Sequence, residues 1–215
     1  ISGKNVAVFP CSVVRFERNP INRVDIRKKY NIPTDAICYV YVGGTQKYQH
    51  LEDLVIPFLA RQLALEKDAW AVIISFKIEE INDLVLKNGL DKNRLSLLKV
   101  DQEYVHQHLQ AFDYGLLLRK KSELNDIAQP VKFGEYLSAG LIPIVEKGTG
   151  SLELLLKKYN FGKVIQSQSK NNYDTELKAS EILEQMNRIK QFVDTEYTIS
   201  SNCKRENDFY LNLIK

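Results

Sequence analysis

Short apolar runs alternate with amphipathic stretches along most of this chain, and this alternation constrains its fold more than any other feature. The runs are Val6–Phe9, Ile37–Val42, Ala71–Ser75, Leu95–Val100, Tyr114–Leu118, Ile142–Glu146 and Lys163–Ile165. Several are rich in β-branched residues, and continuous apolar runs of this kind are typical of strands that are buried on both faces. We therefore predict an α/β fold with a doubly wound, mostly parallel sheet that is covered by helices.

The stretches between the runs have the apolar spacing of helices that bury one face. We expect helices over Ile21–Tyr30, Gln49–Glu66, Ile78–Asn88, Glu103–Ala111, Pro130–Ala139 and Ser151–Tyr159. Pro57 lies inside the second of these stretches, so we expect a kink or a split there.

The pattern changes toward both ends of the chain, which indicates three parts. Residues 1–20 fit either an interdomain linker or a first strand with its loop, and both alternatives stay open. Residues 21–166 carry the regular alternation and are predicted to form one domain. Residues 167–215 begin as a polar loop and continue as two helices, Tyr173–Thr195 and Ser200–Ile214, that have no strand partner. We expect these extra C-terminal helices to pack on the sheet domain or on a neighbouring domain.

Composition and charge argue against several classes of protein. The formal net charge of +3 over 215 residues is too small to indicate nucleic-acid binding. The three cysteines and three histidines lack the paired spacing of zinc ligands, so we expect reduced thiols, no metal site and no cofactor. The sequence contains no apolar run long enough to span a membrane and no visible signal peptide, and we expect a cytoplasmic protein.

Ligands of open α/β sheets bind at the carboxyl ends of the strands, so the loops that leave the strands are candidate binding segments. In one of these loops Gly43 and Gly44 follow a strand, and Lys47 precedes a helix. Glycines let the backbone approach a phosphate closely, a helix N-terminus attracts anions, and a lysine adds a positive charge. The segment is neither a P-loop nor a dinucleotide fingerprint, and a plain tight turn is the alternative.

Two further loops carry residues of similar character. Glu135 lies in a predicted helix with Lys132 three positions before it, and a carboxylate there can accept two hydrogen bonds from a ribose. The segment Gly148–Gly150 lies between a strand and a helix, where backbone amides can hold a diphosphate or the polar groups of a sugar. The alternatives are a solvated glutamate and a simple turn.

The segment QPVKFGEYLSAGLIPIV, residues 129–145, resembles the Glu-Ala-Met-Ala-x-Gly-x-Pro-Val-(Val/Ile) segment of family 4 glycosyltransferases with the GT-B fold. Glu135, Gly140 and Pro143 occupy similar positions, with one residue inserted between the last two. The segments GGTQKYQHLED, EKGTGSLELLLKKYNFGKVI and RVDIRKKYNIP are also similar to parts of this family. The resemblance covers residues 6–165 and is greatest to the bacterial enzymes of capsule and surface-polysaccharide assembly.

The resemblance implies that the chain is the C-terminal, Rossmann-like half of a GT-B fold, which holds a nucleoside-diphosphate sugar. We expect the N-terminal half, which holds the acceptor in this family, to be missing from a sequence that begins at Ile1. The family transfers the sugar with retention at the anomeric carbon and without a required metal. Lys47 resembles its phosphate-contacting lysine and Glu135 its ribose-binding glutamate, and these two are the predicted catalytic residues. The expected donor- and phosphate-binding residues are Gly43, Gly44, Lys47, Arg119, Lys132, Glu135, Gly148, Thr149 and Gly150.

The sequence departs from the family pattern at two positions. The first glutamate of the family's pair would lie eight positions before Glu135, where this chain has Ile127. Asn125 and Asp126 are nearby and Glu123 is further off, and a shifted loop could supply one of these in its place. The arginine that often precedes the family's lysine has no clear match, and Arg119 is either its substitute or a solvated arginine at a strand end.

We therefore expect the donor-binding domain of a retaining glycosyltransferase that acts on a saccharide or lipid-linked acceptor in polysaccharide or glycoconjugate synthesis. A lipid-linked acceptor would bring the protein into peripheral contact with the inner face of the membrane, and no nucleic-acid partner is expected. The alternative is a catalytically inactive nucleotide-binding or scaffold domain of the same fold, which Ile127 favours. A receiver or flavodoxin-like domain is disfavoured, because receivers need clustered acidic residues after their first strand and none follow Val6–Phe9.

Overall fold

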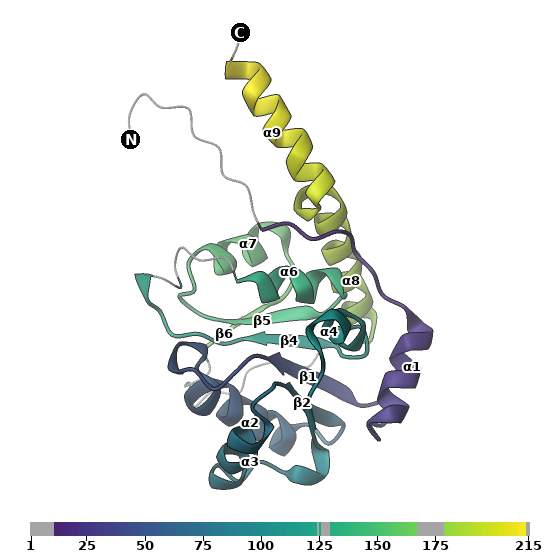
Figure 1. Cartoon of the computed structure of the whole chain (residues 1–215), viewed down its shortest axis with the longest axis vertical. Coiled ribbons are helices and arrows are strands. Elements are labelled where there is room, and N and C mark those ends of the chain that lie inside the picture. The colour runs from purple at the N-terminus through teal and green to yellow at the C-terminus, as the bar shows by residue number, and fades with distance from the viewer. Residues whose placement is uncertain (1–10, 124, 126–129, 167–178, 214–215) are drawn as a thin grey trace.

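The computed structural model describes residues 11–123, 125, 130–166 and 179–213 of the chain. Within these residues a six-stranded parallel sheet has the strand order β3-β2-β1-β4-β5-β6 (Figure 1). The strands are β1 (Ile37–Val42), β2 (Ala69–Ile74), β3 (Leu95–Leu98), β4 (Tyr114–Leu117), β5 (Ile142–Glu146) and β6 (Lys163–Ile165). This is the order of a doubly wound, Rossmann-like sheet, so the predicted fold class is confirmed. The predicted run Val6–Phe9 lies outside the described residues.

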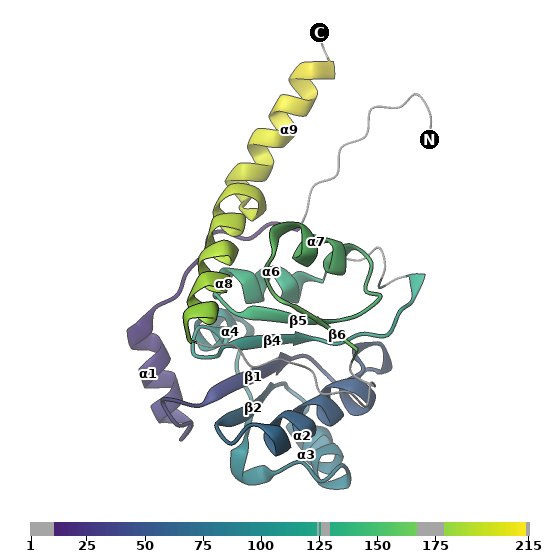
Figure 2. The same cartoon turned by 180° about the vertical axis from the view of Figure 1, so that it is seen from behind.

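Helices connect and flank the strands near the predicted positions. They are α1 (Pro20–Lys29), α2 (Ile56–Leu65), α3 (Ile78–Lys87), α4 (Gln102–Leu109), α6 (Val131–Ser138), α7 (Ser151–Tyr159), α8 (Ala179–Phe192) and α9 (Ile199–Leu213). In Figure 1 α4 lies on the near side of the sheet, and in Figure 2, the view from behind, α8 lies there. Helices therefore cover both faces, which is why the strands can be apolar throughout.

The helix predicted over Gln49–Glu66 is split. A 3-10 turn (η1) spans Lys47–Gln49, a π-helical turn (η2) spans Leu51–Val55, and α2 follows directly. His50 separates the two turns with a left-handed backbone at a φ of 53°. Pro57 is the second residue of α2, directly after the change from π- to α-helical hydrogen bonding, and the helical segment continues through it to Leu65. The split expected at Pro57 is therefore wrong in its position, because the interruption lies at His50.

The centre of the sheet is tightly packed against α6. All residues of β4 and β5 are buried, and the segment Cys38–Val40 in β1 has no exposed surface. Gly115 in β4 is required by this packing, because a Cβ there would lie 2.4 Å from the ring of Tyr136 in α6. The Tyr136 hydroxyl accepts a hydrogen bond from the Val42 amide at 3.1 Å. α6 is thus tied to the carboxyl end of β1.

A buried ionic cluster attaches α1 to the opposite, amino edge of the sheet. Asp113, just before β4, pairs with Arg23 and Arg27 at 2.9 Å each, and Arg18 lies 3.7 Å from it. The Asp113 carboxylate also accepts a hydrogen bond from the Cys38 amide at 2.9 Å. Arg27 is only 1% exposed, but its other donors bind backbone carbonyl groups, so its charge is fully compensated. This cluster fixes the fold at the edge away from the ligand crevice.

The start of the described chain pairs with the segment before α9, next to α6. Val13 forms a parallel bridge with Thr198, in which the Val13 amide donates to the Tyr197 carbonyl at 3.0 Å and the Ile199 amide donates to the Val13 carbonyl at 2.9 Å. Residues 11–20 therefore contribute no strand to the sheet. α8 packs on β5 and α6, whereas α9 projects beyond the sheet (Figures 1 and 2). None of the helices in the described ranges is long and apolar enough to cross a membrane.

Candidate functional site

The centre of the carboxyl edge of the sheet is where this fold forms a ligand crevice. The strand order reverses between β1 and β4, so the connections that leave these two neighbours run to opposite faces. The loop after β1 begins at Gly43 and Gly44, and the segment after β4 contains Arg119, Lys120 and Lys121. A glycine loop and a cluster of positive charges therefore come together at one edge.

Two polar side chains fix the shape of the glycine loop. The Tyr41 hydroxyl lies 2.9 Å from the Gly44 carbonyl and 2.8 Å from Gln49 Oε1, and the Gly44 amide donates to the same Gln49 oxygen at 2.6 Å. A Cβ on Gly43 would lie 2.5 Å from the Tyr41 hydroxyl oxygen, so glycine is required by the close approach of that ring. Burial raises the pKa of Tyr41 far above its ordinary value, and the hydroxyl keeps its proton.

Sequence reasoning identified Gly43 and Gly44 but missed Tyr41 and Gln49. Tyr41 occupies one of the apolar runs, where an aromatic side chain predicts only a buried strand. Gln49 lies in a segment predicted as the start of a helix, where a glutamine carries no signal of its own. A strand-end tyrosine with an amide side chain eight residues later is therefore a contact that only the folded loop reveals.

Lys132 and Glu135 form an ion pair on the partly exposed face of α6. Lys132 Nζ lies 2.7 Å from Glu135 Oε2, and the two side chains are 30% and 27% exposed. Their spacing of three residues places them on neighbouring positions of the helix, as expected. Phe133 and Tyr136 on the other face are fully buried, so α6 presents Lys132 at a fixed place beside β1.

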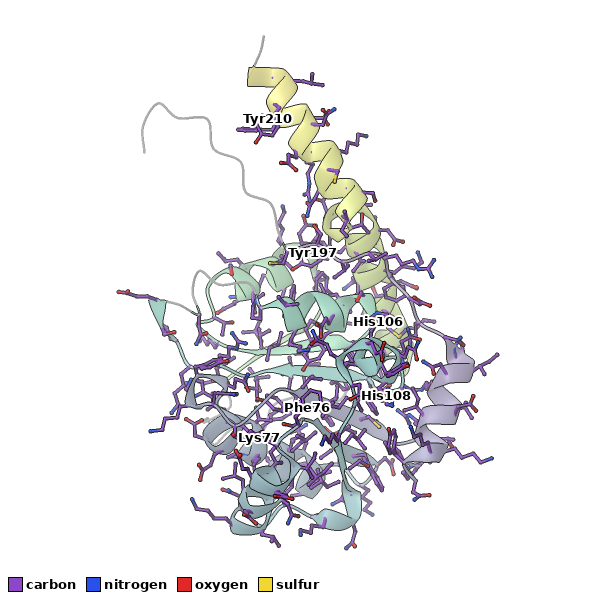
Figure 3. All side chains as sticks on the ribbon, viewed as in Figure 1. Phe76, Lys77, His106, His108, Tyr197 and Tyr210 are labelled. Atoms are coloured by element: carbon purple, nitrogen blue, oxygen red, sulfur yellow. The ribbon has the colours of Figure 1, made fainter. Side chains whose placement is uncertain are left out.

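Lys132 belongs to two cavities at this edge. The larger, about 390 Å³, extends over the ends of β1, β2 and β3; its lining includes the glycine loop, Ile74–Lys77, Val100, Gln102, Val105 and Lys132 (Phe76 and Lys77 in Figure 3). The smaller, about 70 Å³, lies between β1 and β4 and includes Gly43, Arg119 and Lys132. The two share Val42, Gly43, Gln49 and Lys132, so they form adjoining parts of one crevice.

The positive charges of the crevice are only partly neutralised. Arg119 has no ion pair among the residues that the structure describes. Its charge instead acts on the buried Tyr41 and Tyr136 hydroxyls, where it works against the rise in pKa that burial causes. Lys120 pairs with Asp53 at 2.5 Å. Acidic side chains are dispersed, and no group of three or more His, Cys, Asp or Glu residues in the described ranges is placed to hold a metal ion.

Lys47, the predicted catalytic lysine, lies outside this crevice. Gln46 and Tyr48 line the larger cavity, whereas Lys47 between them lines a neighbouring depression of about 350 Å³, which includes His50 and Asp53 and shares Gln46 with the larger cavity. Its side chain is exposed at the start of the 3-10 turn η1. The structure therefore does not bring Lys47 together with Glu135, and Lys132 is the lysine that faces the glycine loop.

The third predicted loop already holds a carboxylate of the chain itself. Gly148 and Gly150 have positive φ values of 89° and 48°, and Gly150 precedes α7 as its N-cap. Glu153 in the first turn of α7 accepts a hydrogen bond from the Gly148 amide at 2.8 Å. Thr149 is buried, and its hydroxyl donates a hydrogen bond to the Glu146 carbonyl at 2.8 Å. Sequence reasoning missed Glu153, although a glutamate three positions after a helix N-cap is a known capping signal.

The departure at Ile127 falls on residues 126–129, which lie outside the described residues, as does Asp126. Asn125 is described and is 7% exposed. Its side-chain amide donates to the Lys120 carbonyl at 2.7 Å, and its backbone amide donates to Ser122 Oγ at 3.1 Å. Asn125 thus closes the turn after β4, and in this conformation its side-chain amide is bonded to the backbone of the loop.

No family model matches this sequence, and no curated protein matches it. Its fold does match solved structures. WaaG, a glycosyltransferase involved in lipopolysaccharide biosynthesis, gives a TM-score of 0.65 at 16% identity, over 94% of this chain and 56% of WaaG. HepE of Anabaena, solved in complex with UDP and glucose, gives 0.66 at 14% identity, over 90% of this chain and 52% of HepE. The C-terminal domain of LpcC, a glycosyl transferase group 1 family protein from Francisella tularensis, gives a TM-score of 0.62 at 17% identity. The match covers 87% of this chain and 97% of the LpcC domain.

These likenesses show the fold. The chain spans slightly more than half the length of WaaG and of HepE, but it spans nearly all of the separately solved C-terminal domain of LpcC. It therefore has the fold of the C-terminal half of a GT-B glycosyltransferase, as the sequence resemblance implied. Membership of family 4 is finer than a likeness of fold and stays a prediction.

Proposed function

We propose that this chain is the donor-binding half of a retaining, family 4 type hexosyltransferase, which takes a sugar from a nucleoside-diphosphate sugar. The observation that carries the proposal is the crevice at the strand-order reversal, where Lys132 and Arg119 lie beside the glycine loop and Arg119 has no ion pair with any residue that the structure describes. A diphosphate bears the negative charge that these cations would neutralise, and the solved complexes of HepE hold UDP, glucose and UDP-glucose. A uridine diphosphate sugar is therefore the first donor to test.

In the proposed reaction the bond between the anomeric carbon and the β-phosphate oxygen breaks, and the nucleoside diphosphate leaves with the bonding electrons. Lys132 and Arg119 would stabilise the negative charge that develops on this leaving group, because charges fixed in a partly buried crevice need little reorganisation. The acceptor oxygen then bonds to the anomeric carbon on the same face of the sugar, and its proton passes to the departing β-phosphate oxygen. We expect no metal in this step.

Glu135 and Lys47 keep the roles that the resemblance implies, as parts of the proposal. Glu135 would accept hydrogen bonds from the ribose hydroxyls once the donor phosphates draw Lys132 away from it. Lys47 would have to turn from the neighbouring depression toward the diphosphate. Its side chain is exposed, so such a rotation is possible. The same holds for the Gly148–Gly150 segment, where a phosphate would have to displace the Glu153 carboxylate from the Gly148 amide.

The remaining partners belong to the whole protein. We propose that a preceding acceptor-binding half completes the cleft, and that the acceptor is a saccharide or a lipid-linked saccharide of polysaccharide or glycoconjugate synthesis. Such an acceptor would place the protein in the cytoplasm at the inner face of the membrane. Nucleic acid is not among the proposed partners.

The proposal is tested by calorimetric titration of the protein with UDP, GDP, ADP and CMP. One nucleotide should bind in preference, and Lys132→Ala should weaken its affinity by about 10- to 150-fold, the equivalent of losing one charge-assisted contact of ~1.5–3 kcal/mol. Lys28→Ala, an exposed lysine on α1, is the matched control and should bind like the parent protein. Equal affinity in the Lys132 variant, or no nucleotide binding by the full-length protein, would refute the donor site.

A catalytically inactive nucleotide-binding or scaffold domain is the second candidate. Ile127 at the position of the family's first glutamate favours it, and so does the Glu153 carboxylate that occupies the Gly148 amide. The two candidates differ in one measurement on the full-length protein. Release of nucleoside diphosphate that depends on an added acceptor identifies the transferase, and its absence with every acceptor identifies the inactive domain.

A further inference from the structure

The larger cavity has two chemically different ends, and their order along the sheet is fixed by the strand order. Lys132 lies at one end, where the cavity adjoins Arg119 after β4. Phe76 after β2 and Gln102 after β3 lie toward the other end. Three strand spacings separate β4 from β3, which is roughly 14 Å. An elongated ligand can therefore contact both ends at once.

Phe76 is unusual for a phenylalanine. It is 59% exposed, it lines the cavity, and its ring contacts no other ring among the described residues. Tyr48 from the glycine loop also lines the cavity and is 55% exposed. Large apolar side chains that stay exposed in a hollow are a sign of a ligand surface, whereas isolated ones on a convex surface need no explanation.

The charges also differ between the two ends. Near Phe76 the only lining cation is Lys77, and Glu80 neutralises it at 2.7 Å while accepting a hydrogen bond from Thr45 of the glycine loop at 2.6 Å. The ion pair with Glu80 leaves Lys77 little charge to offer a phosphate at this end. Arg119 at the other end has no ion pair within the described residues, so its charge attracts a phosphate.

From this asymmetry we infer that the donor lies along the edge with its diphosphate at Lys132 and Arg119 and its base stacked on the Phe76 ring. The inference rests on the proposed function and adds the orientation of the nucleotide and the residue that holds its base. Stacking on an aromatic ring serves any base, because every base has a π-face. Phe76 therefore supplies affinity for the nucleoside as such, and the amide of Gln102 beside it is suited to the polar edge of the base.

The test compares UDP with inorganic pyrophosphate, which has the two phosphates but no base, by calorimetry on the full-length protein. Phe76→Ala should weaken the affinity for UDP by about 5- to 150-fold and leave the affinity for pyrophosphate unchanged. Phe76→Trp should keep the affinity for UDP, because tryptophan also presents an aromatic face. Tyr210→Ala removes an equally exposed ring from α9, far from the cavity in Figure 3, and should change neither affinity.

The outcomes separate this inference from the proposed function. UDP affinity that is unchanged in Phe76→Ala overturns the stacking, even when Lys132→Ala shows that the diphosphate site is correct. Equal loss of UDP and pyrophosphate in Phe76→Ala also overturns it, because it indicates a distorted crevice. Failure of the parent protein to bind either ligand overturns the proposed function and this inference with it.

Discussion

At the scale of single residues, the candidate site is defined by which backbone amides and cations remain available to a ligand. The glycine loops were predicted from the sequence to bind phosphate. However, the Gly44 and Gly148 amides already donate hydrogen bonds to the side chains of Gln49 and Glu153. Arg119 and Lys132 present their charges to the crevice instead. We therefore expect a phosphate at the proposed site to contact side-chain cations rather than these two amides.

One residue-scale prediction concerns Glu153. Hydrogen bonds from Lys157 and from the Gly148 amide hold the pKa of this carboxyl below its ordinary value of 4.5. The folded protein therefore gains stability from the ionised carboxylate above about pH 4.5, and it loses that gain as the pH falls through the lowered pKa. Glu153→Gln should lower the unfolding midpoint by a few degrees at pH 7, and by progressively less toward pH 3.

Thermal unfolding followed by circular dichroism between pH 3 and pH 7 measures this difference. Glu103→Gln on α4, where the structure gives no comparable pair of hydrogen bonds, serves as the control. A midpoint difference between Glu153→Gln and the parent that stays constant over this range would show that the carboxylate charge does not hold the loop.

At the scale of elements, α6 connects the fold to the site. Its buried face is set by Tyr136, whose ring packs directly over Gly115 and whose hydroxyl reaches β1. Its partly exposed face carries Lys132 and Glu135. A change in the packing of this one helix is therefore expected to alter stability and ligand affinity together.

Gly115→Ala tests this connection. The added methyl group would overlap the Tyr136 ring, so we expect a loss of about 1–3 kcal/mol in unfolding free energy and weaker UDP binding as α6 is displaced. Urea unfolding and calorimetry measure the two effects. Combining it with Tyr136→Leu, which removes the ring, should restore part of both. A Gly115→Ala protein with parental stability would show that α6 does not pack as closely as described.

At the scale of the whole molecule, the described residues form one sheet with helices on both faces and a helical extension. α9 projects from the domain (Figure 1). Its Tyr210 and Leu211 side chains are 55% and 51% exposed. The Val13–Thr198 bridge holds the start of the described chain against the start of this helix. This chain spans 56% of WaaG and 52% of HepE, whose solved structures share the fold.

The prediction at this scale is that the acceptor-binding half covers α9. Hydrogen exchange of residues 206–213 should be rapid in the 215-residue chain and at least tenfold slower in a protein that contains both halves, because a covered helix opens less often. Residues of α3, at the other end of the sheet, should exchange equally in both. Equal exchange in α9 would place the second half elsewhere.

The sequence by itself determined the order and type of the elements. The runs that became β1, β5 and β6 had the same bounds as the strands, because an apolar run between helical stretches has few other uses in a soluble chain. It also located the crevice, since parallel strands place their carboxyl ends at one edge, and it named Gly43, Lys132 and Arg119 there. The tertiary structure alone decided which of these act together. It left Lys47 in the lining of a neighbouring depression and brought Phe76 to the cavity, because these positions depend on how loops from different strands pack, which no local pattern specifies. The hydrogen bond between Glu153 and the Gly148 amide is local, and the capping signal at the start of α7 could have predicted it.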